Sequence, residues 1–340
     1  MEAVVADDSG FIRSVVSDIL SKDGIEVIAQ ARNGEEAVEK VIEHRPDVVT
    51  MDVEMPERNG IEAVDDIMDE EPTPVVMFSS HTVEGSERTL EALEKGAVDF
   101  VSKPRGDGPG ITAVEDEITR KVREGARASP QTVKDIQPSV EDEGVDASEA
   151  VVVVGASTGG PGVVESVLKG LPSTTGIRVA VVQHMPEVFT RRLAERLDER
   201  TDLNVYEASD GDVLEPGECA VAPGDGHLLF KNHYKGSTPM AVDNKTEVNN
   251  VMPAIDVTLR SAARYVEEDA YAVVLTGMGS DGARGADRLK RKGGTVIAQN
   301  EETCAVYGIP GSVVEDGNAD EILPPEKIPN EILRQIGGEA

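Results

Sequence analysis

Residues 149–161 form the segment that most restricts the fold. The stretch reads Glu-Ala-Val-Val-Val-Val-Gly-Ala-Ser-Thr-Gly-Gly-Pro. Its four consecutive valines predict a strand that is buried on both faces, as in a parallel sheet covered by helices. The glycines permit a sharp turn, and a helix that begins after the turn would direct backbone N–H groups at Ser157. This geometry suits either a nucleophilic serine or a glycine-rich cradle for a dinucleotide phosphate.

Short apolar runs alternate with helix-like stretches over most of the chain. Such runs predict strands at 3–6, 47–51, 75–78 and 98–101, and again at 151–154, 178–183, 219–222, 272–276 and 295–298. Amphipathic helices are predicted at 11–20, 111–125, 189–199 and 254–266. The region 202–250 is richer in glycine, proline and asparagine and predicts a small antiparallel insertion. The fold class is therefore α/β, with parallel sheets that carry helices on both faces.

The length of the chain indicates two such units, because 340 residues exceed the usual domain size of about 150. The alternation stops at 128–149, where six acidic residues and two prolines stand against a single lysine. This composition is typical of a solvated linker. We therefore expect domains at 1–127 and 150–340, joined by an acidic linker at 128–149.

The chain is strongly acidic, with 65 Asp and Glu against 33 Lys and Arg and a formal net charge of −32. Nucleic acids and anionic membranes need a cationic face, so this charge argues against both as partners. The acids are spread along the whole chain and form no acidic tail, a pattern that suits a cytoplasm of very high salt. We therefore expect a halophilic source, such as a halophilic archaeon.

The sequence contains no pattern typical of export or membrane insertion. The N-terminus lacks a basic region, and Asp7 and Asp8 interrupt its first apolar run, so we expect no signal peptide. No apolar run approaches the roughly 18 residues of a membrane span. Cys219 and Cys304 belong to no metal-ligand pattern and are expected to be reduced core thiols. The prediction is a soluble, cytoplasmic protein.

Polar side chains follow four predicted strands in the N-terminal half. Asp7 and Asp8 end the first strand, Asp52 and Ser79 end two others, and Lys103 ends the last. Because ligands of an open parallel sheet bind at the carboxyl ends of its strands, we expect these side chains to act together. Clustered carboxylates suit a hard cation such as Mg²⁺, and a carboxylate beside that ion can accept a phosphoryl group. A lysine offsets the transferred charge, and a hydroxyl can act as a switch.

This pattern resembles a two-component response-regulator receiver domain over the whole N-terminal unit. The resemblance implies a flavodoxin-like fold and a switch controlled by phosphorylation. By this resemblance, Asp52 would be the phosphoacceptor. The ligands of Mg²⁺ would be Asp7, Asp8, Asp52 and the Glu54 carbonyl. The switch residues would be Ser79, Phe100 and Lys103. We also expect a cis bond between Lys103 and Pro104, since proline makes that isomer accessible.

A second constellation lies in the C-terminal half. A serine nucleophile needs a base to accept its proton and a carboxylate to orient that base. Among five histidines, His184 ends a predicted strand and is the favoured base, while His227 follows a Pro-Gly turn and stays a structural or substrate-facing alternative. Asp281 follows the strand near 272–276 and is the expected orienting acid. The order Ser…His…Asp differs from the Ser…Asp…His order of α/β-hydrolases.

Three segments around these residues resemble the chemotaxis protein-glutamate methylesterases. They read Gly-Ala-Ser-Thr-Gly-Gly, Gln-His-Met and Gly-Met-Gly-x-Asp-Gly, in that family's order. The likeness covers about 150–335 and implies a doubly wound parallel-sheet catalytic domain. It implies a triad of Ser157, His184 and Asp281, with Thr158 and the Met278 backbone N–H as helpers to the serine and the oxyanion. Where the family commonly reads His-Arg-Pro-Ser-Val-Asp, this chain has Val-Met-Pro-Ala-Ile-Asp at 251–256.

The resemblance also implies partners and a mode of control. The substrate would be a glutamate γ-methyl ester on a chemoreceptor, and glutamine side chains would be deamidated by the same machinery. A chemotaxis histidine kinase would phosphorylate Asp52, and the unphosphorylated receiver would cover the Ser157 crevice. No cofactor is expected for the esterase chemistry itself.

Three other classes fit parts of the sequence. The glycines at 155, 159 and 160 resemble the NAD(P)-binding turn of short-chain dehydrogenases, but the next strand lacks a ribose-binding acid and no Tyr-x-x-x-Lys pair occurs. A DNA-binding output would need a basic C-terminal half, whereas this half is acidic. A docking module without catalytic activity is the third alternative, because sequence does not measure a rate.

Overall fold

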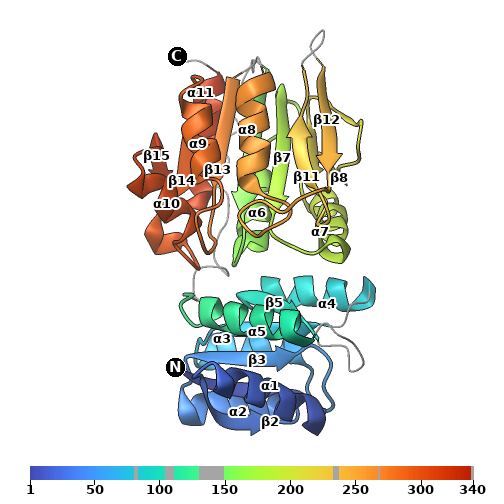
Figure 1. Ribbon diagram of the computed structural model, residues 1–340, viewed down its shortest axis with the longest axis vertical. Coiled ribbons are helices and arrows are strands. Elements are labelled where there is room, and N and C mark those ends of the chain that lie inside the picture. The colour runs from blue at the N-terminus through green and yellow to red at the C-terminus, as the bar shows by residue number, and fades with distance from the viewer. Residues whose placement is uncertain (80–82, 104–110, 130–148, 233–236, 267–268, 338–340) are drawn as a thin grey trace. The chain divides into compact units, whose positions relative to one another are not determined.

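The computed structural model describes residues 1–79, 83–103, 111–129, 149–232, 237–266 and 269–337. The chain separates into two compact units, Met1–Lys134 and Asp135–Ala340 (Figure 1). Most of the predicted linker and the Lys103–Pro104 bond lie outside the described residues. No helix of the described part is long and apolar enough to span a membrane.

The first unit alternates strands and helices from its first residues onward. Its elements are β1 (Glu2–Ala6), α1 (Gly10–Lys22), β2 (Glu26–Ala31), α2 (Gly34–His44), β3 (Val48–Asp52), α3 (Gly60–Glu70), β4 (Val75–Ser79), α4 (Val83–Glu94), β5 (Asp99–Ser102) and α5 (Ile111–Gly125). The strands form one parallel sheet in the order β2-β1-β3-β4-β5 (Figure 1). This is the flavodoxin-like order, so the predicted fold class of the unit is confirmed.

Strand β2 was not among the strands predicted from apolar runs. Most of its residues are half-buried or exposed, because it lies at the edge of the sheet. By contrast, β3 and β4 are buried along their whole length and consist mostly of apolar residues, as is typical of central strands. Apolar runs therefore identified β1, β3, β4 and the edge strand β5, and missed β2 at the opposite edge.

The start of α3 presses against the end of β3. A Cβ added to Gly60 would lie 1.9 Å from the carbonyl oxygen of Asp52. We therefore expect Gly60→Ala to lower the free energy of unfolding of the first unit by more than about 2 kcal/mol, because backbone has to move. Calorimetry of the full chain measures this loss. Gly10→Ala is the matched control, since its added Cβ meets only Arg13, at 3.5 Å. Equal unfolding temperatures for the two variants would contradict the close approach.

The second unit is larger and begins with the valine-rich strand. Its strands are β6 (Ala150–Ala156), β7 (Ile177–Gln183), β8 (Asn204–Glu207), β9 (Val213–Leu214), β10 (Glu218–Val221), β11 (His227–Phe230), β12 (Thr238–Asp243), β13 (Asp269–Val274), β14 (Thr295–Gln299) and β15 (Glu321–Leu323). Its α-helices are α6 (Gly160–Lys169), α7 (Glu187–Arg200), α8 (Ile255–Tyr265), α9 (Ala283–Lys290), α10 (Ile309–Glu315) and α11 (Ile328–Ile336), and short 3₁₀ turns occur at Glu301–Thr303 and Pro325–Lys327.

Seven of these strands form a parallel sheet in the order β15-β14-β13-β6-β7-β10-β8 (Figure 1). Val151 and Val153 pack into a core with residues of α8, α9 and α10, while Val152 and Val154 point to the opposite face and are equally buried. The prediction of a strand covered on both faces is confirmed. The predicted antiparallel insertion is also confirmed, as the three-stranded sheet β11-β12-β9.

The boundaries predicted for the strand near 272–276 were wrong. Strand β13 begins at Asp269 and ends at Val274, and the chain then leaves the sheet toward Gly277. From β6 the chain first runs to β7 and the strands beyond it, and later returns to β13 on the other side of β6. This reversal makes the carboxyl ends of β6 and β13 a topological switch point, where open α/β sheets bind their ligands.

Candidate active site

Ser157 occupies a turn that is held between two neighbouring strand ends. It follows β6 directly, and α6 begins at Gly160 after Gly159, whose φ of 74° is the left-handed conformation that glycine accepts. The Ser157 N–H donates to the Thr276 carbonyl at 3.0 Å, and its own carbonyl accepts from Gln183 Nε2 at 2.9 Å. The positive φ lies two residues after the serine, unlike the strained nucleophile of an α/β-hydrolase.

His184 lies next to this turn because its strand pairs with β6. Ala156 pairs with Gln183, and the His184 N–H donates to the Ala156 carbonyl at 3.1 Å. The ring atom Nε2 lies 3.0 Å from Asp281 Oδ2. A carboxylate only accepts, so Nε2 carries the proton and Nδ1 is the nitrogen that is left as a base.

The Ser157 hydroxyl makes no hydrogen bond to His184 within the described part of the chain. Catalytic hydrogen bonds of this kind are often long without substrate and tighten in the complex, so the geometry is compatible with proton transfer. Ser157 is half-buried and His184 is 11% exposed, and both are therefore within reach of a ligand.

Asp281 is buried among four donors. Besides His184, its carboxylate accepts from Asn249 Nδ2 at 2.6 Å and from the backbone N–H groups of Ile255 at 2.6 Å and Asp256 at 3.2 Å. Burial raises the pKa of this carboxyl, but the hydrogen bond and charge of His184, with the bonds from Asn249 and Ile255, outweigh it and hold the pKa below its ordinary value. Asp281 is therefore ionised at neutral pH and can orient an imidazole.

His227, the alternative base, is a structural residue. It is 3% exposed, and both ring nitrogens are engaged. Nε2 donates to the Thr246 carbonyl at 2.8 Å, and Nδ1 accepts from the Ala254 N–H at 3.0 Å. The ring therefore ties together the two ends of the segment 246–254.

Of the two residues expected to assist the serine, Thr158 follows it in the same turn and Met278 lies on the segment after β13. Thr158 is buried, and its carbonyl accepts from Thr276 Oγ1 at 3.0 Å. A Cβ added to Gly277 would lie 2.7 Å from the Cβ of Ser157, so the segment after β13 runs against the serine. Among the described residues, the N–H of Met278 finds no acceptor. A developing oxyanion beside Ser157 could use this donor.

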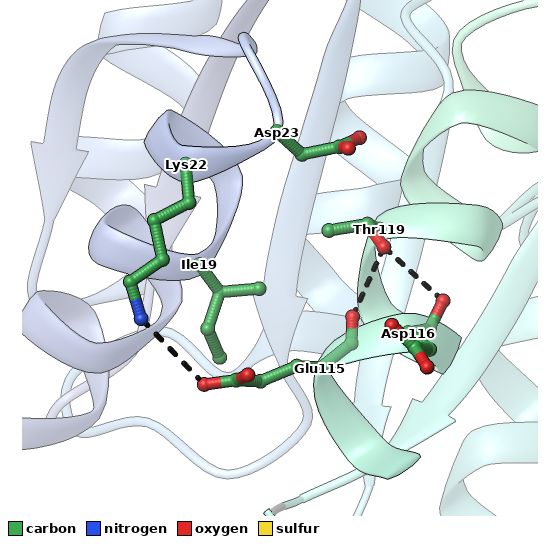
Figure 2. A pocket seen from close by; sticks show the side chains of 6 residues that line it. All are labelled: Ile19, Lys22, Asp23, Glu115, Asp116 and Thr119. Atoms are coloured by element: carbon green, nitrogen blue, oxygen red, sulfur yellow. Dashed lines mark hydrogen bonds and ion pairs between the residues drawn. The ribbon is translucent and has the colours of Figure 1, made fainter. Parts of the chain in front are cut away.

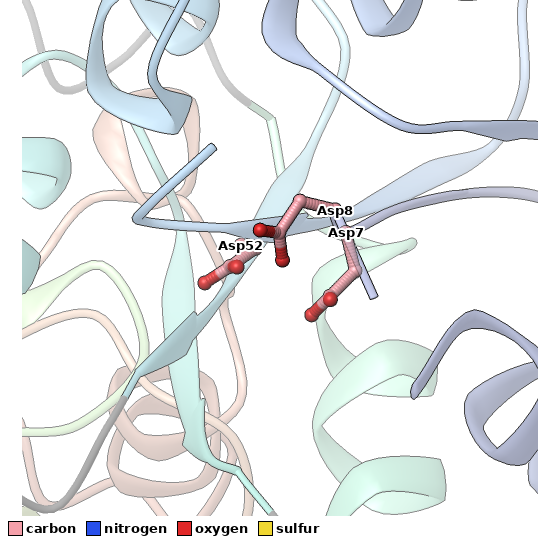
Figure 3. A group of neighbouring side chains, drawn as sticks. All are labelled: Asp7, Asp8 and Asp52. Atoms are coloured by element: carbon pink, nitrogen blue, oxygen red, sulfur yellow. The ribbon is translucent and has the colours of Figure 1, made fainter. Parts of the chain in front are cut away.

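The carboxylates of the first unit gather at the switch point between β1 and β3. Asp7 and Asp8 follow β1, Asp52 ends β3, and one carboxylate oxygen of each lies within 4.8 Å of the others (Figure 3). Lys103 Nζ lies 2.7 Å from Asp52 Oδ2 and 3.1 Å from Asp7 Oδ2. Burial raises the pKa of Asp52 to about 6 and the charge of Asp7 adds to this, although Lys103 and the Glu54 N–H oppose the rise.

This donor set fits a hard divalent cation. Three carboxylates face one another, and among the described residues only the Lys103 ammonium pairs with them, at Asp7 and Asp52, so a cation of charge two would relieve their repulsion. The side chain of Glu54 turns to Arg88, at 2.9 Å, and only its main chain contacts Asp52. Arg13, which the sequence reasoning missed, donates to the carbonyls of Asp7 at 2.6 Å and Asp8 at 3.2 Å and holds that turn in place.

Ser79 and Phe100, the two expected switch residues besides Lys103, are both buried. The Ser79 hydroxyl lies 2.7 Å from Thr89 Oγ1 and 3.2 Å from the carbonyl of Gly85, both in α4. Phe100 is buried in β5, and Lys121 Nζ lies 5.8 Å from the centre of its ring. Both side chains are therefore tied to the helices that follow their strands.

Magnesium is expected to stabilise the first unit specifically. At a concentration 100 times its dissociation constant, a ligand of the folded state adds about 2.7 kcal/mol to the free energy of unfolding. Calorimetry of the full chain with and without Mg²⁺ measures the gain. Because Mg²⁺ also screens the net charge, Asp7→Asn is the control, and stabilisation of equal size in that variant would argue against the carboxylate site.

A separate hollow of about 160 Å³ lies between α1 and α5 (Figure 2). It is lined by Ile19, Lys22, Asp23, Glu115, Asp116 and Thr119. Lys22 pairs with Glu115 at 3.8 Å, and the Thr119 hydroxyl donates to its own helix. The hollow is at the end of α1 that is remote from Asp7 and Asp8, so it is no part of the carboxylate site.

Each of the two units matches a known protein family. The family model for the CheB methylesterase matches residues 152–332, and the model for the response regulator receiver domain matches 3–115. The chain belongs to the CheB methylesterase family. Within it, the chain is similar to the protein-glutamate methylesterase/protein-glutamine glutaminase of Haloarcula marismortui, with 45% identity over 99% of this chain and 98% of that protein.

A similar protein is also found in Thermotoga maritima. The protein of the same description from Thermotoga maritima is 44% identical over 99% of this chain and 98% of its own length. The crystal structure of the Thermotoga maritima CheB methylesterase catalytic domain matches with a TM-score of 0.54 and 46% identity, over 56% of this chain and all of that one. Membership of the CheB methylesterase family leaves the dehydrogenase and DNA-binding alternatives without support.

Proposed function

We propose that this chain is a protein-glutamate methylesterase and protein-glutamine glutaminase under receiver control, with Ser157 as the nucleophile. The hydrogen bond between His184 and Asp281, beside the Ser157 turn at the switch point of the sheet, is the observation that carries the proposal. The names of the similar proteins support the same substrate class.

In the proposed reaction Ser157 Oγ attacks the carbonyl carbon of a glutamate γ-methyl ester. His184 Nδ1 accepts the serine proton, while Asp281 holds the ring by its Nε2–H. The Met278 N–H, assisted by Thr158, would stabilise the negative oxygen of the tetrahedral intermediate. Methanol leaves with the proton from His184, and water then hydrolyses the acyl-enzyme to glutamate and free serine.

The same residues would act on a glutamine side chain. The tetrahedral intermediate then loses ammonia in place of methanol, and both routes pass through the same glutamyl ester of Ser157. The substrates would be methyl-accepting chemoreceptors, on which both reactions leave a glutamate.

The receiver is proposed to control this chemistry. A chemotaxis histidine kinase would phosphorylate Asp52, with Asp7, Asp8, Asp52 and the Glu54 carbonyl as the protein's ligands for Mg²⁺. When bound, that ion offsets negative charge on the transferred phosphoryl group. Lys103 would bind the phosphoryl group, and Ser79 and Phe100 would rearrange in response. We also propose cytoplasmic domains at 1–127 and 150–340, joined by the linker at 128–149.

Release of methanol from methylated receptor membranes tests the proposal. We expect the full chain to respond to a small-molecule phosphodonor with Mg²⁺ and the fragment 150–340 to be active without it. Asp52→Asn should remove the response and leave the basal rate unchanged. No methanol from either protein would refute the esterase, whereas a basal rate that neither truncation nor phosphodonor increases would refute only the control by the receiver.

A further inference from the structure

Two helices at the active site have no side-chain cap of their own. Helix α8 follows Ala254 and helix α9 follows Gly282, and neither of these residues offers a capping side chain. Asp281 accepts from the first N–H groups of α8, at Ile255 and Asp256. Each of these bonds satisfies a donor that a helix leaves unpaired at its start.

The starts of α8 and α9 are capped reciprocally. Asp256 lies in the first turn of α8, and its Oδ1 accepts from the N–H groups of Gly282 at 3.1 Å and Gly285 at 2.7 Å, at the start of α9. Asp281, which immediately precedes Gly282, caps α8 in return. The start of α8 therefore depends on Asp281, which lies next to α9, and the start of α9 depends on Asp256, which lies in α8. Asp281 is also the acid of the proposed triad.

This arrangement places two buried carboxylates side by side, where like charges repel. The amide of Asn249 joins them, since its Nδ2 donates to Asp281 Oδ1 at 2.6 Å and to Asp256 Oδ2 at 3.0 Å. An amide nitrogen carries two hydrogens, so both bonds can form at once. Asn249 thereby occupies Oδ1 of Asp281 and leaves Oδ2 to His184 and the Ile255 N–H.

A tight turn of the backbone places the Asn249 amide between the two carboxylates. Val248 and Val251 form an antiparallel bridge, and the two residues between them, Asn249 and Asn250, have φ values of 58° and 59°. Two positive φ values are what a type I′ turn requires, and asparagine accepts them more readily than most residues. His227 bonds to Thr246 and Ala254 and so holds the two ends of the segment 246–254. These bonds define the position of the Asn249 turn relative to Asp281.

We propose that Asn249, supported by Asp256, is a positioning residue that holds the Asp281 carboxylate in register with His184. Asn249 does not itself take part in proton transfer, and it contacts neither Ser157 nor the ring of His184 through any hydrogen bond that the described residues show. The inference rests on the proposed function of Ser157, His184 and Asp281, and it adds the residue that sets the geometry of the acid.

Two glycine substitutions in one turn test the inference. Asn249→Gly removes the amide and keeps a residue that accepts positive φ, and Asn250→Gly makes the same backbone change without touching either carboxylate. For methanol release by the full chain, we expect Asn249→Gly to lower kcat roughly ten- to a hundred-fold with KM within about two-fold of wild type. Asn250→Gly should leave both constants unchanged.

The proton on His184 Nε2 provides a readout that does not depend on substrate. Its downfield NMR resonance, assigned by its absence in Asp281→Asn, should shift or broaden in Asn249→Gly and stay in place in Asn250→Gly. An unchanged kcat together with an unchanged resonance in Asn249→Gly would overturn the inference, as would a raised KM at constant kcat, which indicates a substrate contact. If the wild-type chain released no methanol, the proposed function would fail while the resonance still tested the positioning of Asp281.

Discussion

Replacing Ser157 by alanine is expected to lower kcat for methanol release by about 10⁴- to 10⁶-fold, because the residual rate then depends on the oxyanion donor and binding alone. The expected effect on folding is small. The Ser157 hydroxyl makes no hydrogen bond within the described part of the chain, so its removal leaves no buried partner unsatisfied. Methanol release and the unfolding temperature, measured on the same preparation, separate the two effects.

Ser280→Ala is the matched control for this substitution. Ser280 is exposed and lies one residue before Asp281, so it shares the neighbourhood of the site without a role in the proposed reaction. Its rate should stay within about two-fold of wild type, as for most surface changes. A Ser157→Ala enzyme that releases methanol at the wild-type rate would show that the nucleophile lies elsewhere.

Asp281→Asn is expected to lower kcat by about 10⁴-fold, because an amide can present hydrogens to the ring and favour the wrong tautomer of His184. Unlike Ser157→Ala, it should also cost stability. Asp281 caps α8 and accepts from Asn249, and loss of a helix cap costs about 1 kcal/mol. Kinetics with the methylated receptor and calorimetry of the full chain measure the two losses.

The pH dependence of stability gives this variant a second signature. The folded-state pKa of Asp281 is held below its ordinary value of 3.8, so its contribution to stability is complete above that value. It is lost as the pH falls through the lower, folded-state pKa. In Asp281→Asn the free energy of unfolding should therefore fall less steeply as the pH is lowered below 3.8. Near neutral pH the substitution should not change how the free energy of unfolding depends on pH.

Asp287→Asn is the control for both readouts. Asp287 lies on α9 and pairs with Arg291 on the surface, where an ion pair is worth at most about 1 kcal/mol. Neither kcat nor the acid-side slope should change measurably. If Asp281→Asn destabilised the protein but kept its kcat, Asp281 would be a helix cap and not the acid of a triad.

Much of the fold was predictable because its signals are local. Runs such as Val151–Val154 mark strands that are buried on both faces, and a run of this kind is legible without knowledge of the partner strands. Edge strands such as β2 and β15 lack that run because water covers part of their surface, and they were missed. The end of β13 was misplaced because the apolar residues continue past the last ladder bond into the turn that carries Met278.

Local sequence signals also identified several residues of the candidate sites. Asp52 in the first sheet, and Ser157 and His184 in the second, stand at the end of a buried strand or directly after it. Within each parallel sheet all such ends share one edge. A residue type and its place after a strand therefore sufficed to nominate these side chains. The choice between His184 and His227 needed the structure, because both stand next to strands and only their hydrogen bonds differ.

By itself, then, the sequence determined two parallel α/β units and the strand ends from which phosphorylation and ester chemistry would come. Only the tertiary structure decided which atom of each side chain does what: Nε2 of His184 toward Asp281, Asn249 between two carboxylates, and Ser79 held by Thr89. The physical reason is distance along the chain. Asn249 lies 32 residues from Asp281, and His184 lies 97 residues from it, so no local pattern encodes these hydrogen bonds.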